Sequence, residues 1–379
     1  MSRPLSIWPT ALTHLKAEHP EHPVLYFAPS VLQDTARRFL AGFDGIVTYA
    51  VKANDARVVI ENLLAAGISG FDVASPAEMR KMRAISASAD LHYNNPVRSP
   101  AEIREAAAMG VCSYSVDGMS ELAKLIGIVP PEGVEVSVRL RLPVEGAAYD
   151  FGEKFGEDPD GCVRLLKAVA EAGFTPSMTF HPGTQCADPA AWTAYIQTCA
   201  DVAERADVRL ARLNVGGGFA ANRGVVPDLE AIFDAIHTSV AEAFGSKAPT
   251  LVCEPGRAMV AEAYALATRV KSVRECGSIF INDGIYGGFA EALLIGVVER
   301  VSVVRPDGSG VTGPTMERIV YGPTCDSVDR LPGALRLPEA LNEGDYLIFG
   351  GMGAYSTATV TRFNGYGAIR VITVRSAGN

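Results

Sequence analysis

A lysine at the end of an apolar segment is the first residue of this sequence whose position points to chemistry. Lys52 follows the apolar run 46–51 in the stretch YAVKAN, and a helical pattern begins near Asp55. Keeping a lysine charged at the mouth of a buried strand costs free energy, so its pKa tends to fall and its amine becomes nucleophilic. Such an amine can form a Schiff base with a carbonyl compound. The alternative is a lysine that extends from the strand end into solvent, and this stretch alone favours neither.

Further polar residues and glycines come at the ends of later apolar segments. They are Asp72 and Ser75, Asn94 and Asn95, Arg139 and Arg141, His181 with Gly183 and Thr184, the run Gly216–Gly218, and Glu254 with Pro255, Gly256 and Arg257. Packing or turn geometry could explain each of them singly. Their recurrence at the end of one apolar segment after another is a stronger signal, because it predicts that they share one polar surface.

The elements that must position these residues alternate regularly. Eight strand-like apolar segments are separated by helical windows in which apolar residues recur three and four positions apart. The strands are expected at 46–52, 70–75, 90–95, 113–118, 135–142, 176–183, 209–217 and 250–256. Eight such units predict an α/β fold with a (β/α)8 TIM barrel, whose working residues lie at the carboxyl ends of the strands. A doubly wound open sheet has the same alternation and is the alternative, but the count of eight favours the barrel.

The pattern changes near Tyr264. Strand-like segments then follow one another with turn residues between them and few helical windows, which predicts a second, C-terminal antiparallel β domain. We therefore predict a barrel domain over 27–263 and a β domain over 264–379. Residues 1–26 are expected to pack on the β domain as an arm, and 24–29 read as a first strand. The expected strands of the β domain are 264–275, 278–284, 298–306, 317–323, 345–351, 358–365 and 368–375.

Composition narrows the class of protein. The chain has 379 residues, of which 48% are hydrophobic and 20% charged, as in ordinary globular proteins. Its net charge of −9 and the lack of a basic run argue against a nucleic-acid partner. No apolar run is long enough to span a membrane, and the N-terminal stretch has no signal-peptide core. The seven cysteines are scattered without a CxxC pair, so we expect neither a disulfide framework nor a zinc site, and a cytoplasmic setting by default.

The residue types at the strand ends suit a particular cofactor. Gly216–Gly218 can bring backbone N–H groups to a phosphate, with Arg257 as a charged donor, although three glycines alone are also typical of a plain turn. Glu254 needs a cationic partner, either a protonated pyridine nitrogen or an arginine. His181 lacks the HxH or HxxxH spacing of a metal site, so we expect a stacking or hydrogen-bonding imidazole and no metal. With Lys52, these residues describe a site for pyridoxal 5'-phosphate.

At this point the sequence resembles a known family. The stretches YAVKAN, GFDVAS, FHPGTQC, NVGGGF, EPGRAMV, GPTCDSVD and GAYSTATVTRFNGY are similar to the motifs of fold-type III pyridoxal-phosphate-dependent decarboxylases, in the ornithine/lysine decarboxylase group. The similarity runs from about Phe27 to the C-terminus in the same order. It implies an alanine-racemase-like barrel, a β domain and a head-to-tail homodimer.

The resemblance also implies roles for single residues around the cofactor. Lys52 would hold the cofactor covalently, His181 would stack on its pyridine ring, and Glu254 would pair with its ring nitrogen. Asp72 would support the site and Arg139 would help to hold the cofactor. The residues expected to bind phosphate or to line its site are Thr184, Gly216, Gly217, Gly218, Gly256, Arg257 and Tyr355.

Other implied roles concern the substrate and a partner subunit. Cys325 and Asp326 would reach into the partner subunit's site, where Cys325 would manage protonation; the alternative for Cys325 alone is a buried structural thiol. Asp326, Asp283 and Tyr286 would bind the substrate, the two acids at its distal amine. Cys followed by Asp goes with ornithine or lysine in this superfamily, and Cys followed by Glu with diaminopimelate or arginine. Lys154 and Asp329 match a pair that bridges the subunit interface in relatives.

The resemblance therefore implies decarboxylation of L-ornithine to putrescine, a small-molecule reaction without nucleic acid or membrane. Lysine or both diamino acids are the first alternative, and other basic or diamino acids follow. A racemase would need a catalytic tyrosine from the β domain, and a non-catalytic regulatory relative usually loses the lysine or the GPTCD motif. The sequence also departs from the family: Asn214 stands where Asp is frequent, Thr184 where Ser is frequent, and the segment 290–296 (AEALLIG) is unusually apolar.

Overall fold

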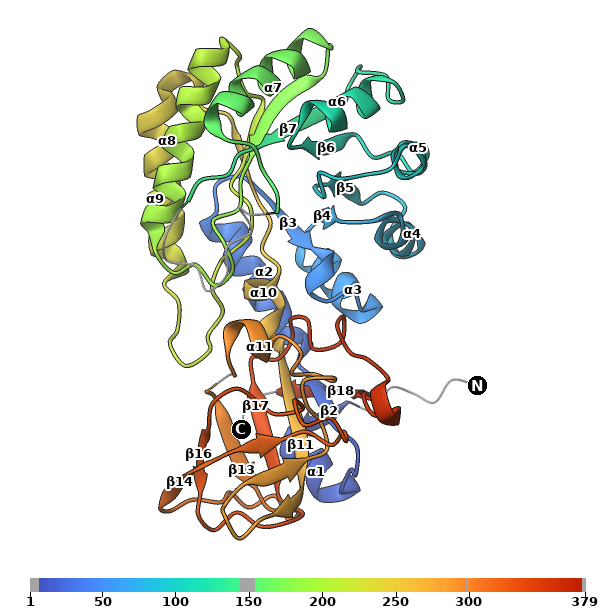
Figure 1. Cartoon of the computed structure of the whole chain (residues 1–379), viewed down its shortest axis with the longest axis vertical. Coiled ribbons are helices and arrows are strands. Elements are labelled where there is room, and N and C mark those ends of the chain that lie inside the picture. Colours follow the sequence, from blue (N-terminus) through green and yellow to red (C-terminus); the bar gives the residue numbers. More distant parts are fainter. Residues whose placement is uncertain (1–6, 144–153, 298, 377–379) are drawn as a thin grey trace. The chain divides into compact units, whose positions relative to one another are not determined.

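The computed structural model describes residues 7–143, 154–297 and 299–376, which form two compact units (Figure 1). We call the first the barrel unit; it comprises the described residues of 36–220 and Pro227–Gly256. The second, the β unit, comprises the described residues up to Thr35, Ala221–Val226 and the described residues from Arg257 on. Each unit has its own β structure and its own buried residues.

Eight parallel strands close the barrel unit in the order in which they occur in the sequence. β10 pairs with β3 through Val252 and Ile46, which closes the barrel. The eight strands predicted from the sequence are therefore confirmed, and the open sheet is excluded. The strands are β3 (Ile46–Ala50), β4 (Gly70–Val73), β5 (Asp90–Tyr93), β6 (Ser113–Val116), β7 (Glu135–Arg139), β8 (Thr175–Thr179), β9 (Arg212–Asn214) and β10 (Thr250–Cys253).

Helices follow the barrel strands, and their starts are encoded locally. Ser75, Ser99 and Asp158 each accept a hydrogen bond from a backbone N–H in the first turn of the next helix, and a proline comes next in each case. Both features favour a helix start. The helices are α2 (Pro29–Gly42, shared between the two units), α3 (Arg57–Ala66), α4 (Pro76–Ile85), α5 (Pro100–Ala108), α6 (Met119–Ile126), α7 (Pro159–Glu171), α8 (Pro189–Ala206) and α9 (Leu229–Phe244), with short 3-10 turns η1 (Val51–Ala53) and η2 (Gly245–Lys247).

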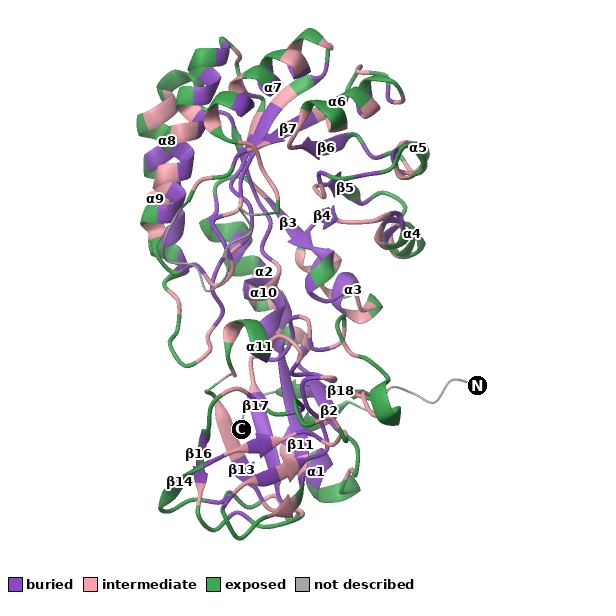
Figure 2. Cartoon of the chain, in the orientation of Figure 1, coloured by how far each residue is buried: buried purple, intermediate pink, exposed green. Residues whose placement is uncertain are grey.

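The barrel strands are buried on both sides, as Figure 2 shows. All four residues of β4 and of β6 are buried. Strands that are covered on both faces read as continuous apolar runs, which is why the sequence showed runs here rather than strict alternation. The helices are buried on one side only, and their exposed residues face outward in Figure 2.

The β unit is built on a mixed sheet with β11 at its centre. β11 (Tyr264–Val273) pairs antiparallel with β2 (Val24–Phe27), β12 (Ile279–Ile281) and β17 (Tyr346–Gly350). β18 (Arg370–Ser376) runs parallel to β2, and β1 (Trp8–Thr10) runs parallel to β18. The remaining elements are α1 (Ala11–Glu18), α10 (Arg257–Val260), η3 (Ala261–Ala263), α11 (Ala292–Ile295), β13 (Val301–Val304), β14 (Thr315–Arg318), β15 (Val320–Tyr321), β16 (Leu335–Pro338) and η4 (Phe363–Gly365).

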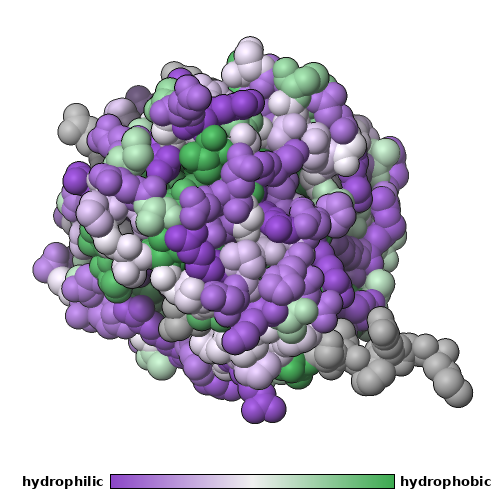
Figure 3. Space-filling model, turned by 90° about the horizontal axis from the view of Figure 1, so that it is seen from below, coloured by the Kyte–Doolittle hydropathy of each residue, from purple (hydrophilic) through white to green (hydrophobic). Residues whose placement is uncertain are grey.

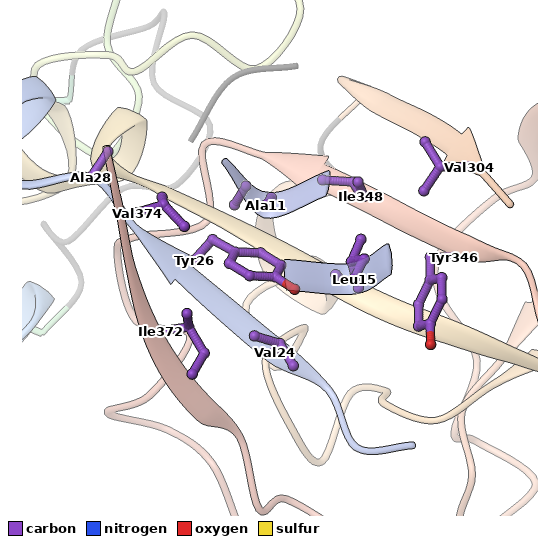
Figure 4. Packing of buried hydrophobic residues seen from close by; sticks show 12 residues of the cluster. Ala11, Leu15, Val24, Tyr26, Ala28, Val304, Tyr346, Ile348, Ile372 and Val374 are labelled. Carbon is purple, nitrogen blue, oxygen red and sulfur yellow. The ribbon is translucent and has the colours of Figure 1, made fainter. Parts of the chain in front are cut away.

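The N-terminal segment contributes to the core of the β unit. Leu15 from α1 and Tyr26 from β2 lie in one apolar cluster with Ile348 and Val374 from the last strands (Figure 4). Tyr26 is fully buried, and its hydroxyl lies 2.8 Å from Nδ1 of His14. The N-terminal strands β1 and β2 and the last strand β18 are thus joined by sheet pairing and by apolar burial.

One predicted strand is wrong: 358–365 forms turns and η4 instead. The backbone N–H and the hydroxyl of Thr361 both donate to the carbonyl oxygen of Tyr286, at 2.9 and 3.2 Å. Asn364, Gly365 and Gly367 adopt left-handed backbone conformations, with φ of 52°, 79° and 87°. An extended ladder needs negative φ, so this segment turns although its residues alternate like those of a strand.

The face drawn in Figure 3 is mostly hydrophilic, with hydrophobic residues in separate small patches. Among the described residues, no helix combines the length and the hydrophobicity needed to cross a membrane. The exposed large apolar side chains of the β unit include Val225 and Val226, and Leu293 and Leu294 of α11. Scattered exposed apolar residues are ordinary on protein surfaces.

Candidate active site

Lys52 and Asp72 form an ion pair at the carboxyl ends of the first two barrel strands. Lys52 lies in η1, directly after β3, and its Nζ is 3.0 Å from Oδ2 of Asp72 on β4. Asp72 is buried, whereas 47% of the Lys52 side chain remains exposed. The buried carboxylate therefore holds the lysine amine at the mouth of the barrel, where solvent and small molecules can reach it.

Glu254 follows β10 and is buried against two amide side chains. Its Oε1 accepts hydrogen bonds from Nδ2 of Asn94 and from Nδ2 of Asn214. Burial raises the pKa of Glu254 to about 7, and the nearby charge of Asp72 adds to this effect, while Lys52 opposes it. Among the described residues, Glu254 therefore bonds to two neutral amide donors and not to an arginine.

His181 presents a neutral imidazole after β8. The backbone N–H of Gly183 donates to its Nδ1 at 3.1 Å, which places the ring proton on the other nitrogen. Burial lowers the pKa of His181 well below its ordinary value, and the charges of Arg139 and Lys52 lower it further. The ring therefore stays uncharged at neutral pH and can offer a flat face.

The run Gly216–Gly218 is packed too closely to neighbouring backbone for any side chain. A Cβ would lie 2.2 Å from the carbonyl oxygen of Phe180 at Gly216, 2.7 Å from that of Glu254 at Gly217, and 2.4 Å from that of Gly183 at Gly218. Gly216 and Gly218 also have positive φ, 71° and 82°. Bare backbone is needed here, which is the property required of an anion cradle made from N–H groups.

Other predicted residues complete the rim of the barrel unit. Arg139 ends β7, its guanidinium lies 5.2 Å from the ring centre of Phe155, and burial lowers its pKa. Thr184 is partly buried in the loop that follows His181. A Cβ on Gly256 would lie 3.1 Å from Cβ of Ala53, so glycine lets this loop pack on the turn that carries Lys52.

In the β unit, Arg257 is already paired. Its two terminal nitrogens donate to the two carboxylate oxygens of Glu291, at 2.7 and 2.6 Å. Its guanidinium also lies 5.1 Å from the ring centre of Tyr355, which has a positive φ of 60°. Glu291 lies in the AEALLIG segment and was not predicted as a site residue. Its ion pair with Arg257 joins residues that are 34 positions apart in the sequence.

A second cluster of the β unit joins Cys325, Asp326 and Tyr286. The Tyr286 hydroxyl donates to Asp326, and this hydrogen bond lowers the pKa of the Asp326 carboxyl. The backbone N–H and Sγ of Cys325 both lie 3.1 Å from Oδ1 of Asn364. The Tyr286 ring contacts Phe363, with 4.8 Å between ring centres. Phe363 and Asn364 were missed because their segment reads locally as a strand.

Two further aspartates lie beneath these loops. The Asp283 carboxylate accepts the Gly288 N–H at 3.0 Å, and burial raises its pKa to about 7. Asp329 accepts from the N–H of Ile285 at 3.1 Å and from the N–H and hydroxyl of Thr324 at 3.0 and 2.7 Å. Asp329 is only 2% exposed. The pairing of Asp329 with Lys154 across a subunit interface, which the resemblance implies, stays a prediction.

The family described as pyridoxal-dependent decarboxylase, pyridoxal binding domain, matches residues 31–261 of this chain. The chain belongs to this family. Ornithine decarboxylase 2 of Drosophila melanogaster is 32% identical over 337 residues, which cover 84% of this chain and 82% of that protein.

Solved structures agree with this assignment. The arginine decarboxylase of Paramecium bursaria Chlorella virus, bound to agmatine, is similar with a TM-score of 0.86 and 26% identity, over 95% of this chain and 98% of that one. The lysine/ornithine decarboxylase of Vibrio vulnificus, complexed with putrescine, gives a TM-score of 0.80 and 28% identity, over 95% and 96%.

The protein is thus a pyridoxal-phosphate-dependent amino-acid decarboxylase, a carboxy-lyase. The barrel mouth fits this cofactor, because it offers an accessible amine on Lys52, bare backbone at Gly216–Gly218 and a carboxylate at Glu254. When bound, pyridoxal phosphate draws electrons from the substrate's α-carbon, so that the bond to the carboxylate can break.

Proposed function

We propose that this decarboxylase converts L-ornithine to putrescine, a step of polyamine biosynthesis. The observation that carries the proposal is the Asp326 carboxylate beside Cys325, held ionised by the Tyr286 hydroxyl. A carboxylate that is already ionised complements the terminal ammonium of a diamino acid. It weakens the binding of apolar substrates, because they would leave the carboxylate unpaired. The similarity to proteins named ornithine decarboxylase supports the same substrate class.

In this proposal the barrel residues hold the cofactor. Lys52 binds it covalently and Asp72 orients the lysine amine. His181 lies against its ring, and Glu254 accepts a hydrogen bond from its protonated ring nitrogen. Arg139 helps to hold the cofactor at the rim. Phosphate binding falls to Thr184, Gly216, Gly217, Gly218 and Gly256, and also to two residues of the β unit, Arg257 and Tyr355.

The β-unit residues act on the substrate. Cys325, an exposed thiol, delivers the proton that replaces carbon dioxide on the α-carbon. Asp326 and Tyr286 bind the distal amine. The resemblance assigns Asp283 to the same amine, but its carboxylate bonds to its own loop at Gly288. We therefore propose that Asp283 acts by supporting the turn that carries Tyr286.

We further propose a homodimer in which Cys325 and Asp326 of one copy complete the site of the other. The exposure of Cys325 supports this, because a residue that serves another copy must be accessible in its own. Mixing Lys52→Ala with Cys325→Ala protein under dissociating conditions and reassociating them should restore activity up to about a quarter of wild type, since half of the dimers then hold one intact site. Mixtures no more active than the separate variants would overturn the sharing.

The deciding experiment measures carbon dioxide release from pyridoxal-phosphate-loaded protein. L-ornithine, L-lysine, L-arginine and meso-diaminopimelate are offered separately, and the diamine product is identified. The highest kcat/KM on ornithine, with putrescine as product, supports the proposal. A higher value on arginine or diaminopimelate contradicts the expected meaning of an aspartate after Cys325.

Lysine, or both diamino acids, is the second candidate, since one of the similar structures is a lysine/ornithine decarboxylase. The apolar segment 290–296, which we propose controls the size of the substrate pocket, includes exposed Leu293 and Leu294. Equal kcat/KM for ornithine and lysine would favour this candidate. We place the reaction in the cytoplasm; all seven cysteines are free thiols, which suits a reducing compartment.

A further inference from the structure

Two asparagines meet at one oxygen of Glu254. Asn214 ends β9 and is 7% exposed, and Asn94 directly follows β5. Both side chains donate through Nδ2 to Oε1 of Glu254. Among the hydrogen bonds of the described residues, none goes to Oε2 of Glu254. The carboxylate is thereby fixed by one oxygen and presents the other.

Asn214 also contacts the glycine run. Its Oδ1 accepts a hydrogen bond from the backbone N–H of Gly216, two positions further along the chain, at 2.9 Å. One side chain therefore bonds at its two ends to the carboxylate of Glu254 and to the first glycine of the predicted phosphate cradle. This fixes the spacing between the two groups that would bind opposite parts of pyridoxal phosphate.

The charge of Glu254 depends on these donors. Burial and the charge of Asp72 favour the neutral acid, while the charge of Lys52 and the hydrogen bond from Asn214 favour the ion, and together they place the pKa of Glu254 at about 7. A pyridine nitrogen binds its proton more strongly beside an ionised carboxylate than beside a neutral acid. Losing either amide donor would shift the balance toward the neutral acid.

We propose that Asn94 and Asn214 are positioning residues that aim Glu254 at the ring nitrogen of pyridoxal phosphate and favour its ionised form. The inference rests on the proposed role of Glu254. It concerns position 214, where the resembling family frequently has aspartate. In this chain an aspartate would have no N–H to donate, and its carboxylate would face that of Glu254, so the two would share a proton.

Asn214→Asp is the sharpest variant, because it keeps the acceptor for the Gly216 N–H, loses the donor to Glu254 and places a second acid beside it. Asn94→Ala removes the other donor without adding charge, and it serves if Asn214→Asp does not fold. The matched control is Asn95→Asp. Asn95 is the neighbour of Asn94, but its side chain bonds to the carbonyl oxygen of Ala74 and to the N–H of Val97.

The measurement compares two cofactors on apo-protein: pyridoxal phosphate and its 1-deaza analogue, in which CH replaces the ring nitrogen. The dissociation constant of each is obtained by absorbance titration at pH 7.5. Wild type should bind pyridoxal phosphate more tightly than the analogue. Asn214→Asp should lower this preference by about tenfold or more, as expected for loss of one charged hydrogen bond, and Asn94→Ala by a smaller factor. Asn95→Asp should leave it unchanged.

Glu254→Gln distinguishes the proposed role of Glu254 from the inferred role of the two asparagines. If Glu254→Gln keeps the wild-type preference for the ring nitrogen, the proposed role of Glu254 itself is wrong. If Glu254→Gln loses the preference while Asn214→Asp and Asn94→Ala both keep it, the role of Glu254 stands and our inference about the asparagines is overturned. A loss of affinity for both cofactors alike would also overturn it, since that marks a structural effect.

Discussion

Glu254 of the barrel unit and Asp326 of the β unit are both carboxylates proposed to meet a cation, and the structure gives them opposite environments. Glu254 is buried, and burial raises its pKa to about 7. Asp326 is partly exposed, and the hydroxyl of Tyr286 lowers its pKa. Glu254 is thus poised to gain its charge together with the group that it binds, whereas Asp326 carries its charge beforehand. The first arrangement suits a resident cofactor, and the second suits selection among arriving substrates.

The two regions also hold their side chains in different ways. In the barrel unit, Lys52 and Glu254 extend from the ends of strands that pair on both sides. In the β unit, loops carry Tyr286, Cys325 and Asp326, and these loops are tied from within by buried Asp329. Substitutions in the barrel unit should therefore act mainly on cofactor chemistry, and substitutions beneath the loops mainly on stability.

The largest effect should come from Lys52→Ala. If Lys52 binds the cofactor covalently, its loss should lower kcat by about 10⁴-fold, the size seen when a catalytic nucleophile is removed. The absorbance band of the lysine-bound cofactor should vanish at the same time. Turnover close to that of wild type would exclude Lys52 from the chemistry, and retention of the band would place the covalent link on another amine.

Asp326→Asn should act on the substrate and leave the cofactor in place. We expect kcat/KM for L-ornithine to fall about tenfold to a hundredfold, because one charged hydrogen bond to the distal amine is lost. The cofactor's spectrum and affinity should stay as in wild type. Tyr286→Phe keeps the carboxylate and is the matched control, with a smaller loss. A shared loss of cofactor affinity would show that the two regions do not divide the work as proposed.

Asp329→Asn tests the loops of the β unit. The carboxylate accepts three hydrogen bonds from Ile285 and Thr324 in a buried position, and an amide can accept fewer. We expect the free energy of unfolding to fall by about 1–3 kcal/mol, the cost of leaving one buried polar group unsatisfied. Urea unfolding of wild type and variant gives the difference. Full stability would mean that the loops are held by other contacts.

The sequence predicted the barrel and most of its rim because the relevant information is local. Apolar runs alternate with amphipathic helices, and a polar residue or glycine ends each run. Lys52, Asp72 and Glu254 could be placed on this basis. The amide partners of Glu254 could not, because Asn94 and Asn214 meet it across 160 and 40 positions.

The β unit was harder to predict for the same reason. The segment 358–365 alternates like a strand, but its backbone bonds to Tyr286, which lies 75 positions away from Thr361. Its left-handed residues at 364, 365 and 367 carry Asn364 to Cys325. Similarly, the pairing of Arg257 with Glu291 could not be read from the sequence, because it forms only in the folded β unit. Contacts between loops depend on the whole fold and leave little trace in local patterns.

The smallest predicted effect is a change in how the free energy of unfolding depends on pH. The same change is expected for one buried carboxyl in each unit. Glu254 and Asp283 are both carboxyls whose pKa burial raises to about 7. Between their unfolded values near 4 and this value, the folded state binds more protons than the unfolded state. Their contribution to stability is therefore greatest at low pH and is lost as pH rises through about 7. The buried His181, whose pKa is lowered, contributes in the opposite direction.

Differences between apo-protein variants isolate each carboxyl from the histidines. Glu254→Gln and Asp283→Asn remove one titrating group each, one from each unit, and leave His181 in place. Relative to wild type, each variant should gain unfolding free energy as the pH is raised from 5 to 8, measured by urea unfolding at one-unit steps. A difference from wild type that stays constant over this range would mean that the carboxyl concerned is already ionised in the folded protein. For Glu254, that outcome would remove the contrast with Asp326, because both acids would then carry their charge before any ligand arrives.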